Sequence, residues 1–146
     1  MEFRFTTPGD REGLKDLSTG LDAVLRRNGL DQALIDDIQL ITEEIVANAI
    51  DHGFIETAPA GRQVTVSLRA EGTRLHMEFR DNGRPFNPLE APPPDLDADI
   101  LDRPIGGLGI HLVRELSEQV YYRREDGQNI LGCTLSRHPP LDGDSE

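Results

Sequence analysis

Lysine and cysteine are almost absent from this sequence, and the two shortages exclude several kinds of site. Lys15 is the only lysine among 146 residues. A Walker-type phosphate loop needs a lysine before its last Ser or Thr, and kinases of the eukaryotic type need a strand lysine, so this chain has neither. Cys133 is the only cysteine. It excludes a disulfide within the chain and argues against a metal site built on thiolates.

Positive charge and long apolar runs are also scarce. The chain has 15 Lys and Arg against 27 Asp and Glu, a formal net charge of −12 at pH 7. Nucleic acids and anionic membranes are bound through patches of Lys and Arg, so we expect neither as a partner. No run of about 18 apolar residues occurs, and residues 1–5 contain no apolar signal region. We therefore expect a cytoplasmic protein without a membrane span.

The pattern of apolar residues predicts an α/β fold. Alternating apolar residues predict strands at 2–6, 64–68 and 75–79 and a hairpin at 120–124 and 130–136. Apolar residues at helical spacing predict helices over 11–28, from Asp31 to about Asp51 and from Ile110 to about Glu118. This order of elements predicts a two-layer α/β sandwich, with a mixed, mostly antiparallel sheet and helices on one face.

One segment interrupts this pattern. Residues 84–105 contain six prolines and five acidic residues, which argues against any regular element there. A structureless stretch of this length in a small domain is typical of a lid or a disordered linker. We expect a single domain over 1–138, followed by an acidic, flexible tail at 139–146.

Two polar side chains lie one turn apart on the helix expected to end near Asp51. Glu44 and Asn48 are separated by four residues, so their side chains stand one above the other. Glu43 points about 100° away. A carboxylate above a carboxamide could hold a metal ion or activate a hydroxyl, and it could equally be a solvated helix face. His52 follows, and we expect it to help end the helix.

Two glycine-containing segments are further candidates for a ligand site, beside Glu44 and Asn48. Gly106–Gly109 precedes a helix, where backbone N–H groups could bind a phosphate or where glycines could simply permit a tight turn. Asp81 and Gly83 follow a strand. An ionised Asp81 could accept a hydrogen bond from the exocyclic amine of adenine, and Gly83 would let a flat ring lie near the backbone. An ordinary turn is the alternative.

In this order, the three segments resemble the N box, G1 box and G2 box of the GHKL ATPase superfamily, whose ATP pocket is known as the Bergerat fold. The matching segments are Glu43–Gly53, Asp81–Pro88 and Gly106–Arg114. Within the superfamily the chain is most similar to the anti-sigma factor serine-protein kinases of bacterial partner-switching systems. The specific features are the form Glu-x-x-x-Asn-Ala-x-x-His-Gly and the Pro-Phe-Asn-Pro extension.

The resemblance implies a role for each candidate residue, with ATP and Mg²⁺ as the cofactors. Glu44 would be the catalytic base, Asn48 would coordinate Mg²⁺ and Asp81 would bind the adenine amine. The rest of the nucleotide site would be formed by Gly83, Pro85, Phe86, Gly106, Gly107, Leu108 and Gly109. Arg103 and Arg114 are candidate cations for the γ-phosphate by proximity only.

The resemblance further implies an ATP-dependent serine/threonine protein kinase that also acts as an anti-sigma factor. Its substrate would be a STAS-domain anti-sigma factor antagonist. A sigma factor or another client protein would be the second partner, and a homodimer is possible. A nucleotide-gated sequestering module without kinase activity is the main alternative, although Glu44, Asn48 and Asp81 are all present. An excised histidine-kinase catalytic domain and a pure ATPase are further alternatives, disfavoured because neither a phosphoacceptor helix pair nor further domains are expected in 146 residues.

Overall fold

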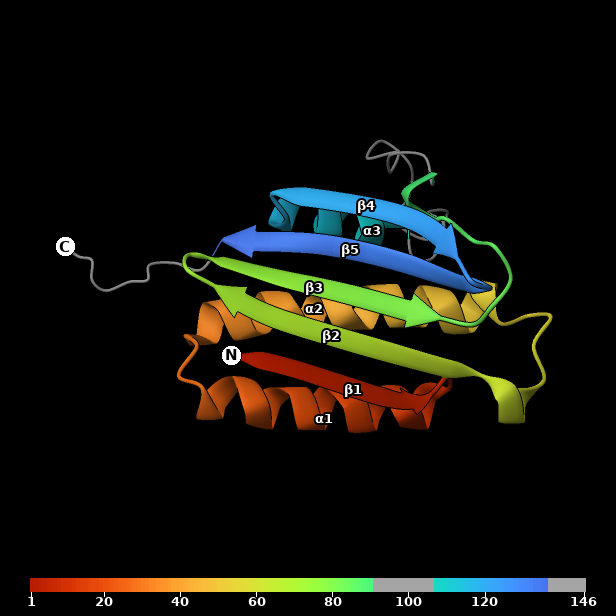
Figure 1. The fold of residues 1–146 in the computed structure, drawn as a ribbon, viewed down its shortest axis with the longest axis horizontal. Helices are drawn as coiled ribbons and strands as arrows, with labels where there is room; N and C mark the ends of the chain where they lie inside the picture. The colour runs from red at the N-terminus through yellow and green to blue at the C-terminus, as the bar shows by residue number, and fades with distance from the viewer. Residues whose placement is uncertain (91–106, 137–146) are drawn as a thin grey trace.

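A five-stranded antiparallel sheet forms one layer of the fold, and helices form the other (Figure 1). The structure is a computed structural model, and it describes residues 1–90 and 107–136. The strands are β1 (Glu2–Pro8), β2 (Gln63–Glu71), β3 (Arg74–Asp81), β4 (Gln119–Glu125) and β5 (Gln128–Ser136). Their spatial order is β1-β2-β3-β5-β4. The predicted two-layer α/β sandwich is confirmed.

The sheet contains no parallel pair among its described strands, so it is simpler than the mixed sheet that was expected. Two α-helices lie between β1 and β2 in the chain. After them, β2 begins at the end of the sheet where β1 ends, so the two strands pair antiparallel. The connection from β3 to β4 contains one α-helix among its described residues, and β3 and β4 run in the same direction because each is antiparallel to β5. Because β5 lies between β3 and β4, these two strands never pair.

Three α-helices of the described residues cover one face of the sheet (Figure 1). They are α1 (Arg11–Arg27), α2 (Gln32–Asn48) and α3 (Gly107–Leu116). The first two begin as expected, because an aspartate caps each. Asp10 accepts a hydrogen bond from the Gly13 amide at 2.7 Å, and Asp31 accepts one from the Leu34 amide at 2.9 Å.

The hydrophobic core fills the space between the two layers. Fully buried side chains come from α1, α2 and the sheet, including Leu17, Leu21, Ile38, Ile41, Val66, Leu68 and Leu75. Along β3 the buried residues alternate as Leu75, Met77 and Phe79. Asp81 is the next position of this alternation, so a carboxyl group ends an apolar row that faces the helices.

The end of α2 differs from the expected helix. The α-helix ends at Asn48, and Ala49–Gly53 forms a turn of π-helix (η1), in which the Phe54 amide donates to the Ala49 carbonyl at 2.9 Å. The predicted α-helical end near Asp51 is therefore wrong. The wider turn buries Phe54 completely and directs the carbonyl of Gly53 toward the amide of Arg84, which donates to it at 2.9 Å. Turns of this kind are frequent at functional sites.

The bounds of α3 also differ from the expectation. The helix begins at Gly107, three positions before Ile110, so Gly107–Gly109 form its first turn instead of a preceding loop. It ends at Leu116 and does not continue to Glu118. The reason lies in the sheet, because the Glu118 amide donates to the Thr134 carbonyl at 2.7 Å and so starts the pairing of β4 with β5.

Part of the expected lid is described, and part is not. The prediction of no regular element is wrong for Pro88–Glu90, which forms a short 3-10 helix (η3) started by the Asn87 side chain accepting from the Leu89 amide at 2.9 Å. A second 3-10 helix, η2, spans Pro59–Gly61. Residues 91–106 and the tail lie outside the described residues, so the domain bounds remain predictions. Among the helices that are described, none is long and apolar enough to cross a membrane.

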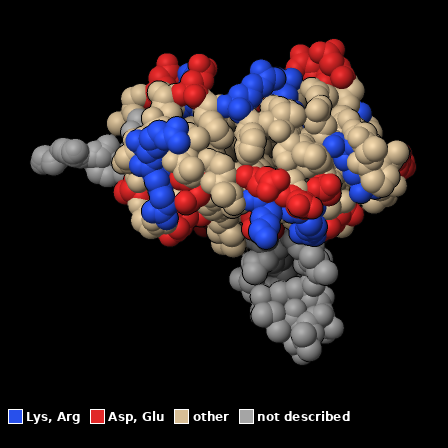
Figure 2. Space-filling model, turned by 90° about the horizontal axis from the view of Figure 1, so that it is seen from below, with Lys and Arg blue, Asp and Glu red and all other residues tan. Residues whose placement is uncertain are grey.

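Charged side chains of both signs are interspersed on the surface shown in Figure 2. The described residues form exposed ion pairs, such as Arg11 with Asp51 at 2.8 Å and Arg26 with Asp22 at 2.9 Å. Each exposed pair contributes about 0–1 kcal/mol. On this side of the molecule, acidic side chains lie among Lys and Arg side chains and do not form one large patch.

Candidate functional site

The predicted site residues that the structure describes lie at one end of the sheet, where β3 ends, β5 begins and the C-terminal end of α2 lies behind them (Figure 1). The loop after β3 contacts η1 there through the Arg84 amide and the Gly53 carbonyl. A Cβ at Gly83 would clash with the carbonyl oxygen of Gly53. Only glycine therefore allows the two backbones to approach so closely. This reason is separate from the predicted contact of Gly83 with a flat ring, which stays a prediction.

At this end of the sheet, one of the two carboxylate oxygens of Asp81 accepts hydrogen bonds from described residues, and the other does not. Its Oδ1 accepts hydrogen bonds from the Gly83 amide at 3.0 Å and from Nδ2 of Asn129 at 2.9 Å. No donor among the described residues contacts Oδ2. Burial raises the pKa of Asp81, and the two hydrogen bonds and the charge of Arg124 oppose that rise. The free oxygen can accept a hydrogen bond from a ligand amine.

Asn129 is a residue of the candidate site that sequence reasoning missed. It lies directly opposite Asp81 in the pairing of β3 with β5, and only 4% of it is exposed. Its side chain also accepts a hydrogen bond from the Phe86 amide at 3.1 Å and donates one to the Arg84 carbonyl at 2.7 Å. The alternation of apolar residues along β5 could have placed Asn129 on the helix-facing side, but nothing local in the sequence indicates its partner.

Phe86 and Pro85 belong to the loop that Asn129 holds. The ring of half-buried Phe86 stacks on His52, with ring centroids 5.5 Å apart and an angle of 30° between the planes. Pro85 is exposed. His52 lies within η1 and its carbonyl accepts from Nε of Arg84 at 3.0 Å. The loop after β3 is thus joined to the end of the α2 segment by side-chain stacking as well as by backbone hydrogen bonds.

Glu44 and Asn48 lie as the sequence predicts, one turn apart near the C-terminal end of α2. Asn48 is buried, with 8% exposed, whereas Glu44 is half-buried and Glu43 is exposed. Within residues 1–90 and 107–136, no group hydrogen-bonds to the side chain of Glu44 or of Asn48. Burial, and secondarily the charge of Glu43, raises the pKa of Glu44. A carboxylate and a carboxamide are therefore both available to a ligand.

The helix α3 packs against α2, and its first turn carries the glycines of the third predicted segment that the structure describes. This turn consists of Gly107, Leu108 and Gly109, and the first N–H groups of a helix have no partner within it. Gly106 and Arg103 lie outside the described residues. Arg114 donates through Nη2 to the Leu89 carbonyl at 2.6 Å, so its guanidinium contacts the described start of the expected lid.

The donor set fits Mg²⁺ held partly by a nucleotide. No group of three or more His, Cys, Asp or Glu side chains among the described residues could hold a metal ion. Mg²⁺ does not require three protein side chains, because it is commonly bound by one or two protein oxygens together with substrate phosphates and water. The buried carboxamide of Asn48, which has no partner in the described part of the chain, can supply such an oxygen.

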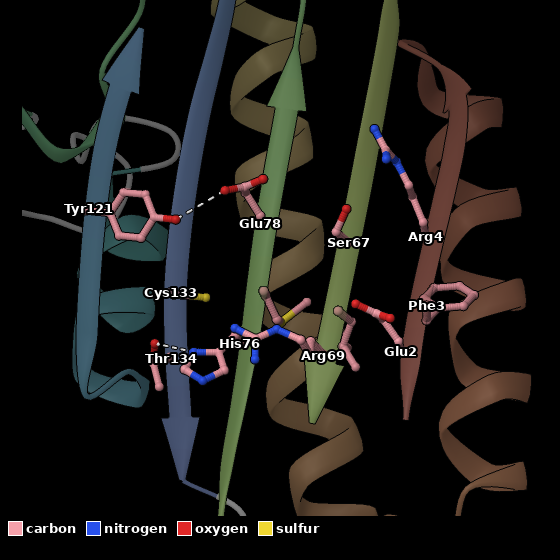
Figure 3. Close-up of a pocket in the computed structure, with 12 residues that line it drawn as sticks. Glu2, Phe3, Arg4, Ser67, Arg69, His76, Glu78, Tyr121, Cys133 and Thr134 are labelled. Carbon is pink, nitrogen blue, oxygen red and sulfur yellow. Dashed lines mark hydrogen bonds between the residues drawn. The ribbon is translucent and has the colours of Figure 1, made fainter. Parts of the chain in front are cut away.

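A separate hollow of about 550 Å³ lies on the helix-free face of the sheet (Figure 3). Residues of all five strands line it, and the Tyr121 hydroxyl donates to Glu78 at 3.2 Å across its floor. The ring of Tyr121 lies over Gly132, where a Cβ would clash with it. None of the predicted site residues lines this hollow.

Residues 7–135 match the family described as the histidine kinase-like ATPase domain. The chain belongs to this family. It is 32% identical over 101 residues to the serine/threonine-protein kinase BtrW of Bordetella bronchiseptica, covering 69% of this chain and 68% of the relative. It is 25% identical over 115 residues to the serine-protein kinase RsbW of Listeria monocytogenes, covering 76% and 72%.

The solved structure of the RsbU and RsbW domains of a Mycobacterium tuberculosis protein matches the fold, with a TM-score of 0.64 and 18% identity. The match covers 94% of this chain and 32% of that chain, so this chain spans about a third of its length. These findings confirm the fold and the resemblance of the chain to this family. An ATPase domain implies ATP binding, while the roles of individual residues remain to be proposed.

Proposed function

We propose that this histidine kinase-like ATPase domain is an ATP-dependent serine/threonine protein kinase and an anti-sigma factor of a bacterial partner-switching system. Its substrate is a STAS-domain anti-sigma factor antagonist. The observation that carries the proposal is the pair Glu44 and Asn48, whose side chains have no partners among the described residues and lie at the end of the sheet occupied by Asp81. The names of the relatives, which are serine-protein kinases, support it.

The nucleotide would lie between the end of β3 and the C-terminal end of α2. Oδ2 of Asp81 accepts a hydrogen bond from the exocyclic amine of adenine, and Gly83, Pro85 and Phe86 line the base. The phosphates lie near the backbone of Gly106–Gly109. Asn48 would hold Mg²⁺, which would neutralise charge on the phosphates.

Glu44 is the proposed base for phosphoryl transfer. It accepts the proton of the substrate serine hydroxyl as the serine oxygen forms a bond to the γ-phosphorus. The bond from that phosphorus to the bridging oxygen of ADP breaks, and ADP leaves with the electron pair. A raised pKa brings Glu44 closer to the working pH, where proton acceptance is more effective.

Phosphorylation would end the competition between two partners. The unphosphorylated antagonist and a sigma factor, or another client protein, compete for this chain, and the phosphorylated antagonist dissociates. A homodimer would be compatible with this scheme. The formal net charge of −12 favours an effect on transcription through proteins over direct DNA binding.

The test measures phosphate transfer from γ-labelled ATP with Mg²⁺ into proteins of a source-cell lysate. Wild type is compared with Glu44→Gln, Asn48→Ala and the matched control Glu43→Gln, since Glu43 is exposed one position away. We expect one small protein to carry an acid-stable label, as phosphoserine or phosphothreonine does. The label should fall by about 10²–10⁴-fold in Glu44→Gln and stay within a factor of about two in Glu43→Gln.

Other outcomes would assign other functions. ATP binding by wild type with no label above the Glu44→Gln background would replace the kinase by a nucleotide-gated sequestering module. An acid-labile label would indicate histidine phosphorylation, and release of free phosphate alone would indicate an ATPase.

A further inference from the structure

The side chain of Asn129 is the centre of a hydrogen-bond network that joins three strands and the loop after β3. Its Nδ2 donates to Oδ1 of Asp81 and to the Arg84 carbonyl. Its Oδ1 accepts from three groups, which are the Phe86 amide, the Tyr122 hydroxyl and Nη1 of Arg124. Both ends of a 4% exposed amide are therefore satisfied by protein groups.

The surroundings of Asn129 require an amide in one orientation. The nitrogen faces two acceptors and the oxygen faces three donors, so a flipped amide would face the wrong partners. An aspartate at this position would place a second carboxylate against Asp81. An amide presents donors on one side and an acceptor on the other, whereas a carboxylate presents acceptors alone.

The hydrogen bonds around Asn129 determine which carboxylate oxygen of Asp81 remains accessible to a ligand. Asp81, Asn129 and Arg124 lie side by side across β3, β5 and β4, because Asp81 pairs with Asn129 and Arg124 pairs with Asn129. Arg124 also donates to the Gly83 carbonyl at 2.8 Å. Oδ1 of Asp81 is thereby held by Asn129 and by the Gly83 amide, and the rotation of the carboxylate is restricted.

We propose that Asn129 is a positioning residue that sets the nucleobase specificity of the site. By donating to Oδ1 of Asp81, it directs Oδ2 toward the ligand as a pure acceptor. The site then selects a purine triphosphate with an exocyclic amine over the same purine without one. This inference rests on the proposed function, because it concerns the base bound by the proposed kinase.

The test compares the dissociation constants of ATP and of purine riboside triphosphate, which has the same ring system without the 6-amino group. The informative variants are Asn129→Thr and Asn129→Val. The two side chains have similar shapes and both lose the carboxamide oxygen, but only threonine keeps a donor that can reach Asp81. Asn82→Ala is the control, because Asn82 holds Gly61 and Gln63 by side-chain hydrogen bonds and does not hydrogen-bond to Asp81.

We expect wild type and Asn82→Ala to prefer ATP by about 10- to 100-fold, the range for a hydrogen bond to a charged group. The preference should fall by about tenfold in Asn129→Val and should be partly restored in Asn129→Thr. A purely structural role would weaken the binding of both nucleotides by the same factor and leave their ratio unchanged, and that result would overturn the inference.

A measurement on wild type keeps the inference testable if the variants do not fold. The side-chain amide protons of Asn129 should shift in NMR spectra on addition of ATP and shift much less with purine riboside triphosphate, because only ATP donates to Asp81. Equal shifts with both nucleotides would overturn the inference and leave the kinase proposal intact. Failure of wild type to bind ATP would overturn the proposed function and this inference with it.

Discussion

Two buried asparagines mark the two ends of the candidate site, and their surroundings are opposite. Asn129, at the base end, is 4% exposed and its amide makes five hydrogen bonds. Asn48, at the phosphate end, is 8% exposed, and its side chain makes none with the described residues. The described residues therefore satisfy the amide at one end of the site, and at the other end they supply no partner to it.

The difference separates recognition from chemistry. A purine is a rigid ring, so the groups that recognise it can be fixed before it arrives, as Asn129 fixes Asp81. Phosphates, a metal ion and a substrate hydroxyl must enter and change during phosphoryl transfer. Glu44 and Asn48, the residues proposed to act on groups of that kind, have no side-chain hydrogen bond to a described residue.

The largest expected effect on nucleotide affinity comes from replacing the carboxylate of Asp81, which only accepts hydrogen bonds, by an amide, which also donates them. In Asp81→Asn, the new carbonyl oxygen can still accept from Gly83 and Asn129, which leaves an NH₂ group facing the adenine amine. Two donors would then face each other, and ATP affinity should fall by about 100-fold. Titration calorimetry measures this loss, and an unchanged circular dichroism spectrum shows that the fold is kept. Affinity within a factor of about three of wild type would contradict the assignment of Asp81.

Deleting each asparagine tests the contrast directly. Asn129→Ala leaves buried partners of its amide unsatisfied, so the free energy of unfolding should fall by about 2 kcal/mol or more. Asn48→Ala removes a buried amide that has no described partner, and stability should change by less than about 1 kcal/mol or rise. Urea unfolding of the two variants at neutral pH gives both values. Equal losses of unfolding free energy in the two variants would show that the side chains of Asn129 and Asn48 have similar surroundings, and would contradict the contrast between them.

The smallest effect is a pH dependence at Asp81, whose pKa burial raises above the ordinary value of 3.8. Between pH 3.8 and the raised pKa of Asp81 in the folded state, the folded protein binds more protons than the unfolded chain. The free energy of unfolding of wild type therefore falls as pH rises through this window. Asp81→Asn lacks this titration. The free energy of unfolding of the variant minus that of wild type should therefore increase with pH through this window and stay constant above it. A difference that decreases with pH would show that the pKa of Asp81 is lowered.

The local parts of this site could be predicted from sequence. Alternation along 75–79 placed Asp81 at the end of a buried row, and helical spacing placed Asn48 one turn beyond Glu44. Both arguments use periodicities within one element, which the backbone imposes directly. The aspartate caps at Asp10 and Asp31 were predictable for the same reason.

The parts that depend on pairing between distant segments could not be predicted. Asn129 gains its role only from the register that sets it against Asp81. The π-helical turn at Ala49–Gly53 is stabilised partly by Arg84, which belongs to a different motif. The start of α3 at Gly107 also contradicts the helix propensity of glycine, which is outweighed there by tertiary structure.

The row formed by Asp81, Asn129 and Arg124 also sets an order of events during synthesis. Asp81 leaves the ribosome 48 residues before Asn129, so it must wait for nearly the last strand before its carboxylate is oriented. The hairpin of β4 and β5 closes this row over a long sequence separation, and contacts of that kind form late. In the mode of ATP binding proposed above, the orientation of Asp81 depends on the pairing of β5 with β3, so selective ATP binding would require that this last described strand is already in place.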